Sequence, residues 1–303
     1  MKYRNIALAV ALSFGLAAPV MAADYYLAVE PIYPPAQAQQ VYKPLLAYLS
    51  KSTGHRFLLK PAANYHVYWR DLRTNAKVDF AFEEAHFTEY RINRQKFVPL
   101  ARVADATNFV LLADPQREKS GVNGLIGDRI VSMSAPSMGY LLLGELYSNP
   151  LAQPEINSAA ATWRDGVEMV FSGETDAAMV PNYVAREYPN LVPLFTSREF
   201  AARAFSASQT VPADVRKKVA DALLRLHRDS SLNEVLVELG TTQFVPANTS
   251  EYTGSERLLR GVFGYQALPQ RATAPAAPPA PAKPGAKPAD KAKGVTVEVG
   301  GKG

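Results

Sequence analysis

The chain of 303 residues contains no cysteine, and this absence excludes two kinds of structure. Without thiols the chain forms no disulfide bond, and it carries no lipid anchor of the bacterial type that is attached to cysteine. Histidine is also scarce, at four residues, so common catalytic bases and metal ligands are few. These absences argue against an enzyme, and we expect neither a cofactor nor a resident metal.

Long apolar runs are also missing, apart from one at the start of the chain. Lys2 and Arg4 precede an apolar stretch at residues 6–16, and residues 20–22 form a small-residue cleavage pattern. This arrangement is typical of a secretory signal peptide, and the stretch is too short for a transmembrane helix. We therefore predict that residues 1–22 are removed and that the mature chain begins at Ala23, free in the periplasm.

A strong charge of one sign is absent from the body of the chain, although the net charge is +5. The signal segment and the last 35 residues carry that excess, so the body is close to neutral. Residues 269–303 are rich in proline, alanine and lysine, and they lack the apolar bulk that a core needs. We expect a disordered tail there, with tethering to an anionic cell surface as the alternative. The basic composition therefore gives no reason to expect nucleic-acid binding.

The body of the chain contains two matched halves, at residues 24–102 and 108–195. Each half has an extended run, a helical segment and then a short stretch in which aspartate precedes apolar residues. That aspartate is Asp79 in KVDFAF and Asp176 in GETDAAMV. Two similar α/β lobes with a cleft between them favour a ligand clamp over a catalytic scaffold.

Apolar periodicity predicts alternating strands and helices in both halves. Strands are expected at 25–29, 57–59, 78–82, 98–103, 109–113, 130–133, 177–180 and 191–195. Helices are expected at 38–50, 65–74, 87–94, 163–171, 212–227 and 232–239, with one more after residue 137. Pro44 is placed in the first turns of its helix, and Gly54 is expected to end it. The alternation predicts mainly parallel sheets flanked by helices.

Several segments, in order, resemble the periplasmic substrate-binding proteins of phosphate, phosphite and phosphonate ABC transporters. They lie between residues 25 and 252: VYKPLLAYLSKSTG, PAANYHVYWRDLRTNAKVDFAF, SAPSMGYLLL, WRDGVEMVFSGETDAAMV and LGTTQFVPA. The resemblance implies a two-lobed periplasmic-binding-protein fold of type 2, with the ligand cleft at the hinge. Ligands of open α/β sheets sit at the carboxyl ends of the strands. We expect lobe 1 at 23–105 plus 205–268 and lobe 2 at 106–204.

The resemblance also implies a set of ligand-binding residues. Tyr65 occupies the position of a tyrosine that faces the ligand in the family, and Ser134, Ser137 and Met138 belong to the segment that corresponds to the anion loop. That loop reads Ser-Thr-Ser-Gly in the family, and here the aligned residues 136–139 read Pro-Ser-Met-Gly. Proline lacks the backbone N–H that an oxyanion would use.

Two further positions depart from the family pattern. Glu83 and then Glu84 stand where a second aromatic residue follows the strand, and Trp163 stands where a histidine is expected. Tyr65, Glu83 and Trp163 together would suit a cationic or amine-bearing ligand, through charge pairing and aromatic faces. Alternatively, Trp163 packs within its lobe and Glu83 is a solvated residue at a strand end.

Three other questions about candidate residues stay open at this point. Glu83, Glu84 and His86 could bind a metal, but their spacing equally fits a loop that enters a helix. Ser134 and Ser137 could include a nucleophile, although Ser137 also suits a helix N-cap. Tyr33 and Tyr183 follow strands and could line the cleft or serve as ordinary interfacial tyrosines.

These observations predict a periplasmic solute-binding protein of an ABC transporter, which captures a small polar ligand that resembles phosphonate or phosphate. The alternative is a sensor that reports an amine or other cationic ligand to a membrane receptor or kinase. An enzyme on the same fold is the third hypothesis. The expected partners are the small-molecule ligand and either a permease or a membrane sensor; we expect a monomer and no nucleic acid.

Overall fold

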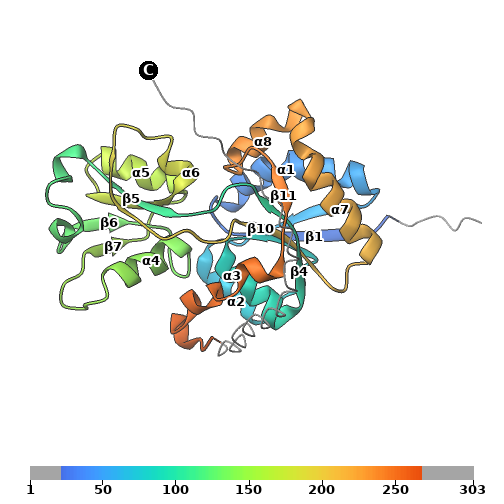
Figure 1. The fold of residues 1–303 in the computed structure, drawn as a ribbon, viewed down its shortest axis with the longest axis horizontal. Coiled ribbons are helices and arrows are strands. Elements are labelled where there is room, and N and C mark those ends of the chain that lie inside the picture. The colour runs from blue at the N-terminus through green and yellow to red at the C-terminus, as the bar shows by residue number, and fades with distance from the viewer. Residues whose placement is uncertain (1–21, 268–303) are drawn as a thin grey trace, which may run out of the picture. The chain divides into compact units, whose positions relative to one another are not determined.

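The computed structural model describes residues 22–267, which form two sheets with flanking helices (Figure 1). The signal peptide expected at 1–22 lies outside the described residues except for Ala22, and so does the tail expected at 269–303. The parts of the chain around the two sheets are called the first and second lobe below. The residue boundaries expected for the lobes stay a prediction.

The sheet of the first lobe has six strands, in the order β11-β4-β10-β3-β1-β2. Their bounds are Phe244–Pro246 (β11), Phe97–Val103 (β4), Ala204–Ser208 (β10), Phe80–Glu83 (β3), Asp24–Val29 (β1) and Arg56–Lys60 (β2). β1 is parallel to β2 and β3, whereas β10 is antiparallel to both β3 and β4. This sheet is therefore mixed: β1 to β4 run in one direction, and β10 and β11 run in the other.

Helices cover both faces of this sheet (Figure 1). They are α1 (Pro35–Thr53), α2 (Tyr65–Arg73), α3 (Ala85–Tyr90), α7 (Ala213–Arg225) and α8 (Asn233–Glu238). The helices α7 and α8, which come late in the chain, both contact α1. α3 continues into a π-helical turn at Arg91–Gln95.

The first helix shows how local sequence sets an element's ends. Pro35 begins α1, a position where the missing N–H of proline costs nothing. Gly54 ends the helix as predicted, with φ at 79° and its N–H bonded to the Ser50 carbonyl. Because the helix begins three residues earlier than expected, Pro44 lies in its interior, and the placement in the first turns is wrong.

The sheet of the second lobe has five strands, in the order β7-β6-β8-β5-β9. Their bounds are Glu155–Asn157 (β7), Arg129–Val131 (β6), Ala177–Pro181 (β8), Phe109–Ala113 (β5) and Val192–Thr196 (β9). β6 is parallel to β7 and β8, and β5 is antiparallel to its neighbours β8 and β9. The helices of this lobe are α4 (Met138–Leu146), α5 (Trp163–Phe171) and α6 (Asn182–Ala185).

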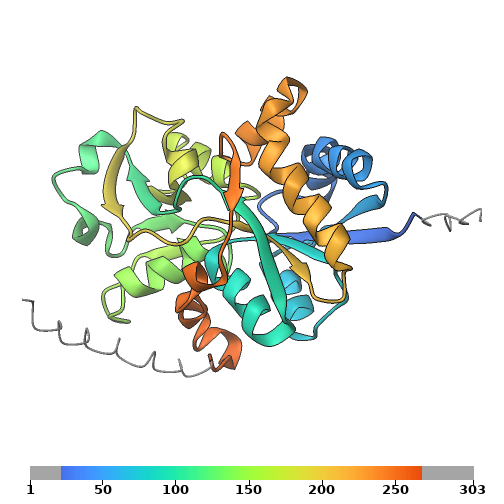
Figure 2. The ribbon, with the colours of Figure 1, turned by 45° about the vertical axis from the view of Figure 1, so that its right-hand side comes forward.

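The chain crosses between the lobes twice, at residues 104–108 and 197–203. The crossings pair with each other through an isolated antiparallel bridge between Thr107 and Phe200. Further along, the turn Ser255–Leu259 contacts α3 of the first lobe and α4 of the second (Figure 2). Two crossing segments side by side form the hinge region of the molecule.

The matched aspartates have equivalent roles in the two lobes. The Asp79 carboxylate accepts a hydrogen bond from the Tyr26 N–H in β1, at 2.9 Å, just before β3 begins. The Asp176 carboxylate likewise accepts from the Arg129 N–H in β6, at 3.0 Å, just before β8 begins. Each aspartate thus joins the starts of two parallel strands, which is why the same short pattern occurs in both halves of the sequence.

Candidate functional site

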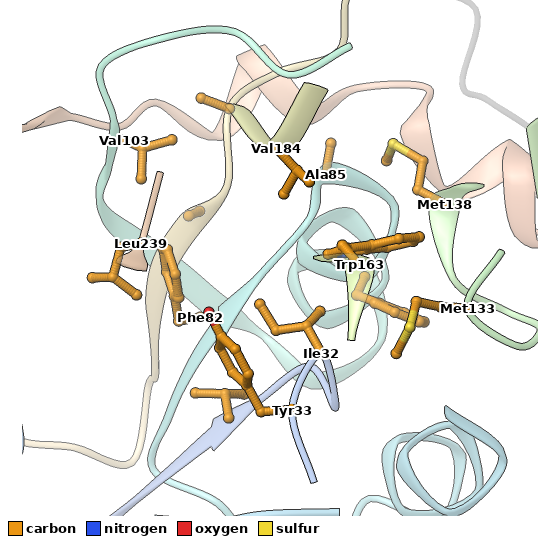
Figure 3. Packing of buried hydrophobic residues seen from close by; sticks show 14 of the residues in the cluster. Ile32, Tyr33, Phe82, Ala85, Val103, Met133, Met138, Trp163, Val184 and Leu239 are labelled. Carbon is orange, nitrogen blue, oxygen red and sulfur yellow. The ribbon is translucent and has the colours of Figure 1, made fainter. Parts of the chain in front are cut away.

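The two lobes meet in a crevice beyond the carboxyl ends of β1 and β3. Ile32 and Tyr33 enter it from the first lobe, and Trp163 and Tyr183 enter it from the second. Figure 3 shows Ile32 and Tyr33 near Trp163, with the two methionines Met133 and Met138 beside the indole. The crevice encloses a cavity of ≈ 10 Å³, close to the smallest space that holds one water. A larger ligand therefore requires the lobes to move apart.

Trp163 is the largest side chain of the second lobe in the crevice. The Thr162 hydroxyl caps α5 by accepting from the Asp165 N–H at 3.0 Å, and this fixes the position of Trp163 as the first helical residue. Its indole lies against Gly139, where an added Cβ would come within 3.1 Å of the ring. The indole thus covers the first turn of α4, where free N–H groups would otherwise favour an anion.

In the loop before α4, the Ser137 hydroxyl bonds to the backbone of the loop and of the helix. Ser137 donates to the Met133 carbonyl at 2.8 Å and accepts from the Tyr140 N–H at 3.3 Å, so it acts as an N-cap. Met138 is buried at 1% exposure. Neither Ser134 nor Ser137 lines the crevice cavity. The arrangement therefore offers an oxyanion fewer donors than the expected loop would.

The Glu83 carboxylate is paired with other side chains of the first lobe. Both of its carboxylate oxygens accept from the Arg91 guanidinium, at 2.7 and 2.8 Å, and the Tyr68 hydroxyl donates to it as well. The ion pair is buried, with side-chain exposures of 3% for Arg91 and 0% for Glu83. Glu83 is therefore neither solvated nor free to pair with a ligand while this contact persists.

Its neighbour Glu84 points into a different environment. Glu84 lies 3.6 Å from the Arg203 guanidinium of the second crossing segment, and its own N–H donates to Glu30 at the end of β1. Glu30 also accepts from the Tyr65 hydroxyl at 2.9 Å. The two carboxylates thus meet just beyond the ends of β1 and β3, beside Arg203.

Burial changes the pKa of both carboxyl groups. It raises the pKa of Glu84 to about 7, against the opposing effects of the Arg203 charge and the Thr107 hydroxyl. It raises the pKa of Glu30 well above its usual range, and the nearby Glu84 charge adds to this increase. Both shifts favour a protonated carboxyl at this pair up to about neutral pH.

Tyrosine rings surround the same carboxylates. The Arg203 guanidinium stacks on the Tyr183 ring, with 4.4 Å between its Cζ and the ring centroid, and it donates to the Leu239 carbonyl. Burial raises the pKa values of Tyr65 and Tyr183 well above the usual range, so both hydroxyls stay protonated. The site therefore combines carboxylates, aromatic faces and one guanidinium.

Polar contacts between the lobes hold the crevice closed. Glu238 of α8 accepts from the Tyr33 hydroxyl at 2.8 Å and from the Arg164 guanidinium of the second lobe at 3.2 Å. His86 of α3 bonds through Nε2 to the carbonyl of Pro136 in the second lobe, at 3.0 Å. Burial lowers the pKa of His86 to about 3, so the imidazole is neutral there.

Three of the eight residues expected at the site line the crevice cavity: Tyr33, Trp163 and Tyr183. Met138 lies beside the Trp163 indole (Figure 3), and Tyr65 bonds to Glu30. Sequence analysis did not identify Glu30, Arg203 or Glu238 as site residues. Glu30 directly follows a buried strand, which is a signal that could have identified it. Arg203 precedes β10, a strand that periodicity did not predict, so its position at the site had no sequence signal.

Within residues 22–267, no three histidine, aspartate or glutamate side chains are grouped as metal ligands would be. Glu83, Glu84 and His86 instead make three separate sets of contacts.

None of the helices described in the structure is both long and apolar enough to cross a bilayer.

Several solved structures share this fold. The methylphosphonate complex of PhnD1 from Prochlorococcus marinus matches with a TM-score of 0.66 and 15% identity, over 80% of this chain and 99% of that one. A phosphonate-transporter binding protein from Pseudomonas aeruginosa matches with a TM-score of 0.64 and 13% identity, over 78% and 86%. An ATP-bound Xanthomonas citri protein matches with a TM-score of 0.59 and 15% identity, over 78% and 95%.

No curated protein matches the sequence. The family model that does match describes the periplasmic substrate-binding protein of a phosphonate ABC transporter, and it matches residues 27–252. This match covers both lobes and the two crossing segments. The family binds a small-molecule ligand and works in the periplasm with an ABC permease. The chain therefore belongs to the family of periplasmic substrate-binding proteins of phosphonate ABC transporters.

Proposed function

We propose that this protein captures a small polar ligand in the crevice between its lobes and delivers it to an ABC permease. The observation that carries this proposal is the crevice itself, which lies at strand ends, beside the hinge, with ionisable and aromatic side chains converging on it. Binding and closure then suffice as the mechanism, without catalysis. We further propose that the protein is a monomer, that it binds no nucleic acid and that its signal peptide is cleaved on export.

Family membership supports a ligand that resembles phosphonate or phosphate. Methylphosphonate in the Prochlorococcus protein and ATP in the Xanthomonas protein are both phosphorus oxyanions. In this chain the Ser137 hydroxyl is engaged and Trp163 covers the start of α4. These two contacts support a rebuilt site, in which an amine or other cationic group takes part in recognition.

A thermal-shift screen of the mature protein tests ligand capture. The panel contains phosphate, phosphite, alkylphosphonates, 2-aminoethylphosphonate and organic amines. A ligand that binds only the folded state at 100 times its Kd adds about 2.7 kcal/mol to stability, so Tm rises. If no member of the panel changes Tm at millimolar concentration, the proposal fails for these classes.

The two tryptophans allow the binding site to be located. Trp163 lies in the crevice, whereas Trp69 packs inside the first lobe against Phe87 and Tyr90. In Trp69→Phe, the remaining Trp163 emission should change on ligand addition. In Trp163→Phe, the matched control, Trp69 emission should stay constant. A response from Trp69 alone would place the ligand elsewhere.

A sensor that reports its ligand to a membrane receptor or kinase would use the same crevice and the same closure. Uptake of the ligand by cells that lack the gene separates the two roles. Loss of uptake supports transport, and unchanged uptake with a lost transcriptional response supports sensing.

A further inference from the structure

The Glu84 carboxylate has an oxygen with no partner, although the side chain is buried. Glu84 is 6% exposed, and its Oε2 has no hydrogen bond within the described residues. Its Oε1 lies 3.6 Å from the nearest Arg203 nitrogen, too far for a normal hydrogen bond. Glu84 does not itself line the crevice cavity, but Arg203 beside it stacks on Tyr183, which does. Buried carboxylates usually have partners, so an unpaired oxygen next to the crevice indicates a position for a ligand donor.

The charges around Glu84 do not balance. Glu83 is neutralised by Arg91, which leaves Glu30 and Glu84 with one guanidinium between them, that of Arg203. The other groups that face Glu84 are neutral: the Thr107 hydroxyl of the first crossing segment and the tyrosines Tyr65 of α2, Tyr183 of α6 and Tyr252 of the turn Thr249–Tyr252. The pair of carboxylates therefore lacks one positive charge, and a proton or a bound cation can supply it.

Aromatic faces at the same place suit an organic cation. Arg203 already stacks on the Tyr183 ring at 4.4 Å and over the Phe82 ring at 5.2 Å. Trp163 and Tyr33 line the adjoining crevice. Rings and a carboxylate together recognise ammonium groups through cation–π attraction and charged hydrogen bonds.

We infer that the ligand carries an ammonium group that binds the unpaired Glu84 oxygen and takes the place of the proton held by Glu30 and Glu84. The ammonium keeps its own protons, and the displaced proton passes to solvent. This inference rests on the proposed function, because it specifies the ligand of the same crevice. It assigns the recognition of charge to Glu84 and not to Glu83.

Proton displacement makes the affinity depend on pH. Burial raises the pKa of Glu84 to about 7, so the pair holds its extra proton below that pH. Below about pH 7, Kd should fall by up to about tenfold for each unit by which the pH rises. Above about pH 7, Kd should level off. His86 is neutral in the closed crevice and does not change its charge in this range.

Calorimetric titration with a matched ligand pair tests the inference. At about pH 8 we expect 2-aminoethylphosphonate to bind at least about tenfold more tightly than ethylphosphonate. Titration in buffers with different ionisation enthalpies should show release of a proton near pH 6. Glu84→Gln should reduce the preference to within about twofold and abolish the release. Glu118→Gln removes an exposed charge of the second lobe, outside both crossing segments, and should leave both unchanged.

The outcomes separate this inference from the proposed function. Equal binding of both phosphonates, with no proton release, overturns the inference and leaves ligand capture intact. If neither phosphonate nor ethylammonium binds at millimolar concentration, both fail. The pH profile of the wild-type protein tests the inference even if Glu84→Gln does not fold.

Discussion

Two adjacent glutamates have opposite roles at the residue scale. Glu83 is the last residue of β3, and its side chain is paired with Arg91 inside the first lobe. Glu84 is the next residue, and its side chain faces Arg203 in the hinge region. Because successive side chains of an extended segment point in opposite directions, one glutamate stabilises the lobe and the other borders the crevice.

Glu83→Gln should destabilise the protein strongly. The substitution leaves the buried Arg91 guanidinium without its counter-charge, and breaking a buried pair in this way costs about 3–5 kcal/mol. Chemical denaturation should show this loss in the free energy of unfolding. Glu84→Gln is the matched control and should cost far less near pH 7. A loss below about 1 kcal/mol for Glu83→Gln would show that the pair is unimportant.

Glu84 should also make stability depend on pH. Its pKa in the folded protein, about 7, exceeds the ordinary value of 4.5, so the folded state holds the extra proton. The stabilising contribution is therefore complete below about pH 4.5 and is lost as pH rises through about 7. The Tm of the wild type minus that of Glu84→Gln should fall between about pH 5 and about pH 8.

His86 changes the pH dependence of stability in the opposite direction. Its lowered pKa stabilises the protein above about pH 6.5, and this contribution is lost as pH falls toward 3. Subtracting the Glu84→Gln curve removes the His86 effect, because both proteins contain His86. Parallel curves for the two proteins would contradict a raised pKa at Glu84.

At the scale of elements, the repeated aspartate is a structural device. Asp79 and Asp176 each accept an N–H from the neighbouring parallel strand. Asp176 also pairs with Arg117 at 2.5 Å, so its replacement removes a second contact.

Asp79→Ala and Asp176→Ala should each lower the free energy of unfolding by about 1–3 kcal/mol, because a strand N–H loses its acceptor. Asp71→Ala, which removes only a contact with the exposed Arg70, should cost less than about 1 kcal/mol. Urea denaturation compares the three. Equal effects for Asp71 and Asp79 would contradict the assigned role.

The elements that sequence could predict are those with a clear apolar period. β1 and α5 were predicted within one residue of their bounds because apolar side chains recur in them at regular spacing, and β5 because FVLLA is a continuous apolar run. β10 was missed because AFSAS is short and rich in small residues, so it shows neither alternation nor a run of large apolar side chains. β7 and β11 have three residues each, too few for a period to appear.

The same limit applies to the site. Tyr33 and Tyr183 could be assigned because they follow strands, and Trp163 through the family resemblance; all three line one crevice. Which of Glu83 and Glu84 faces the ligand depends on the side of the strand that Arg91 occupies, a property of tertiary packing. The alternation of strands and helices predicts that the strands of a sheet run mainly in one direction. In the first lobe, β10 runs antiparallel to β3 and β4, because the chain re-enters this lobe from the hinge.

At the scale of the whole molecule, function depends on movement of the lobes. The crevice encloses ≈ 10 Å³, and contacts between the lobes close it, namely Arg164 with Glu238 and His86 with Pro136. A ligand must displace these contacts to enter and must replace them to hold the lobes together. Capture therefore requires an open state that ligand binding converts to a closed one.

The distance between the lobes tests this claim most directly. The absence of cysteine allows two spin labels to be attached uniquely, through Lys51→Cys on α1 and Leu151→Cys on the second lobe, both at exposed positions. Pulsed electron paramagnetic resonance then measures the distance distribution with and without saturating 2-aminoethylphosphonate. We predict a broad distribution without ligand and a single narrower, shorter one with it. An unchanged distribution at saturation would contradict capture by lobe closure.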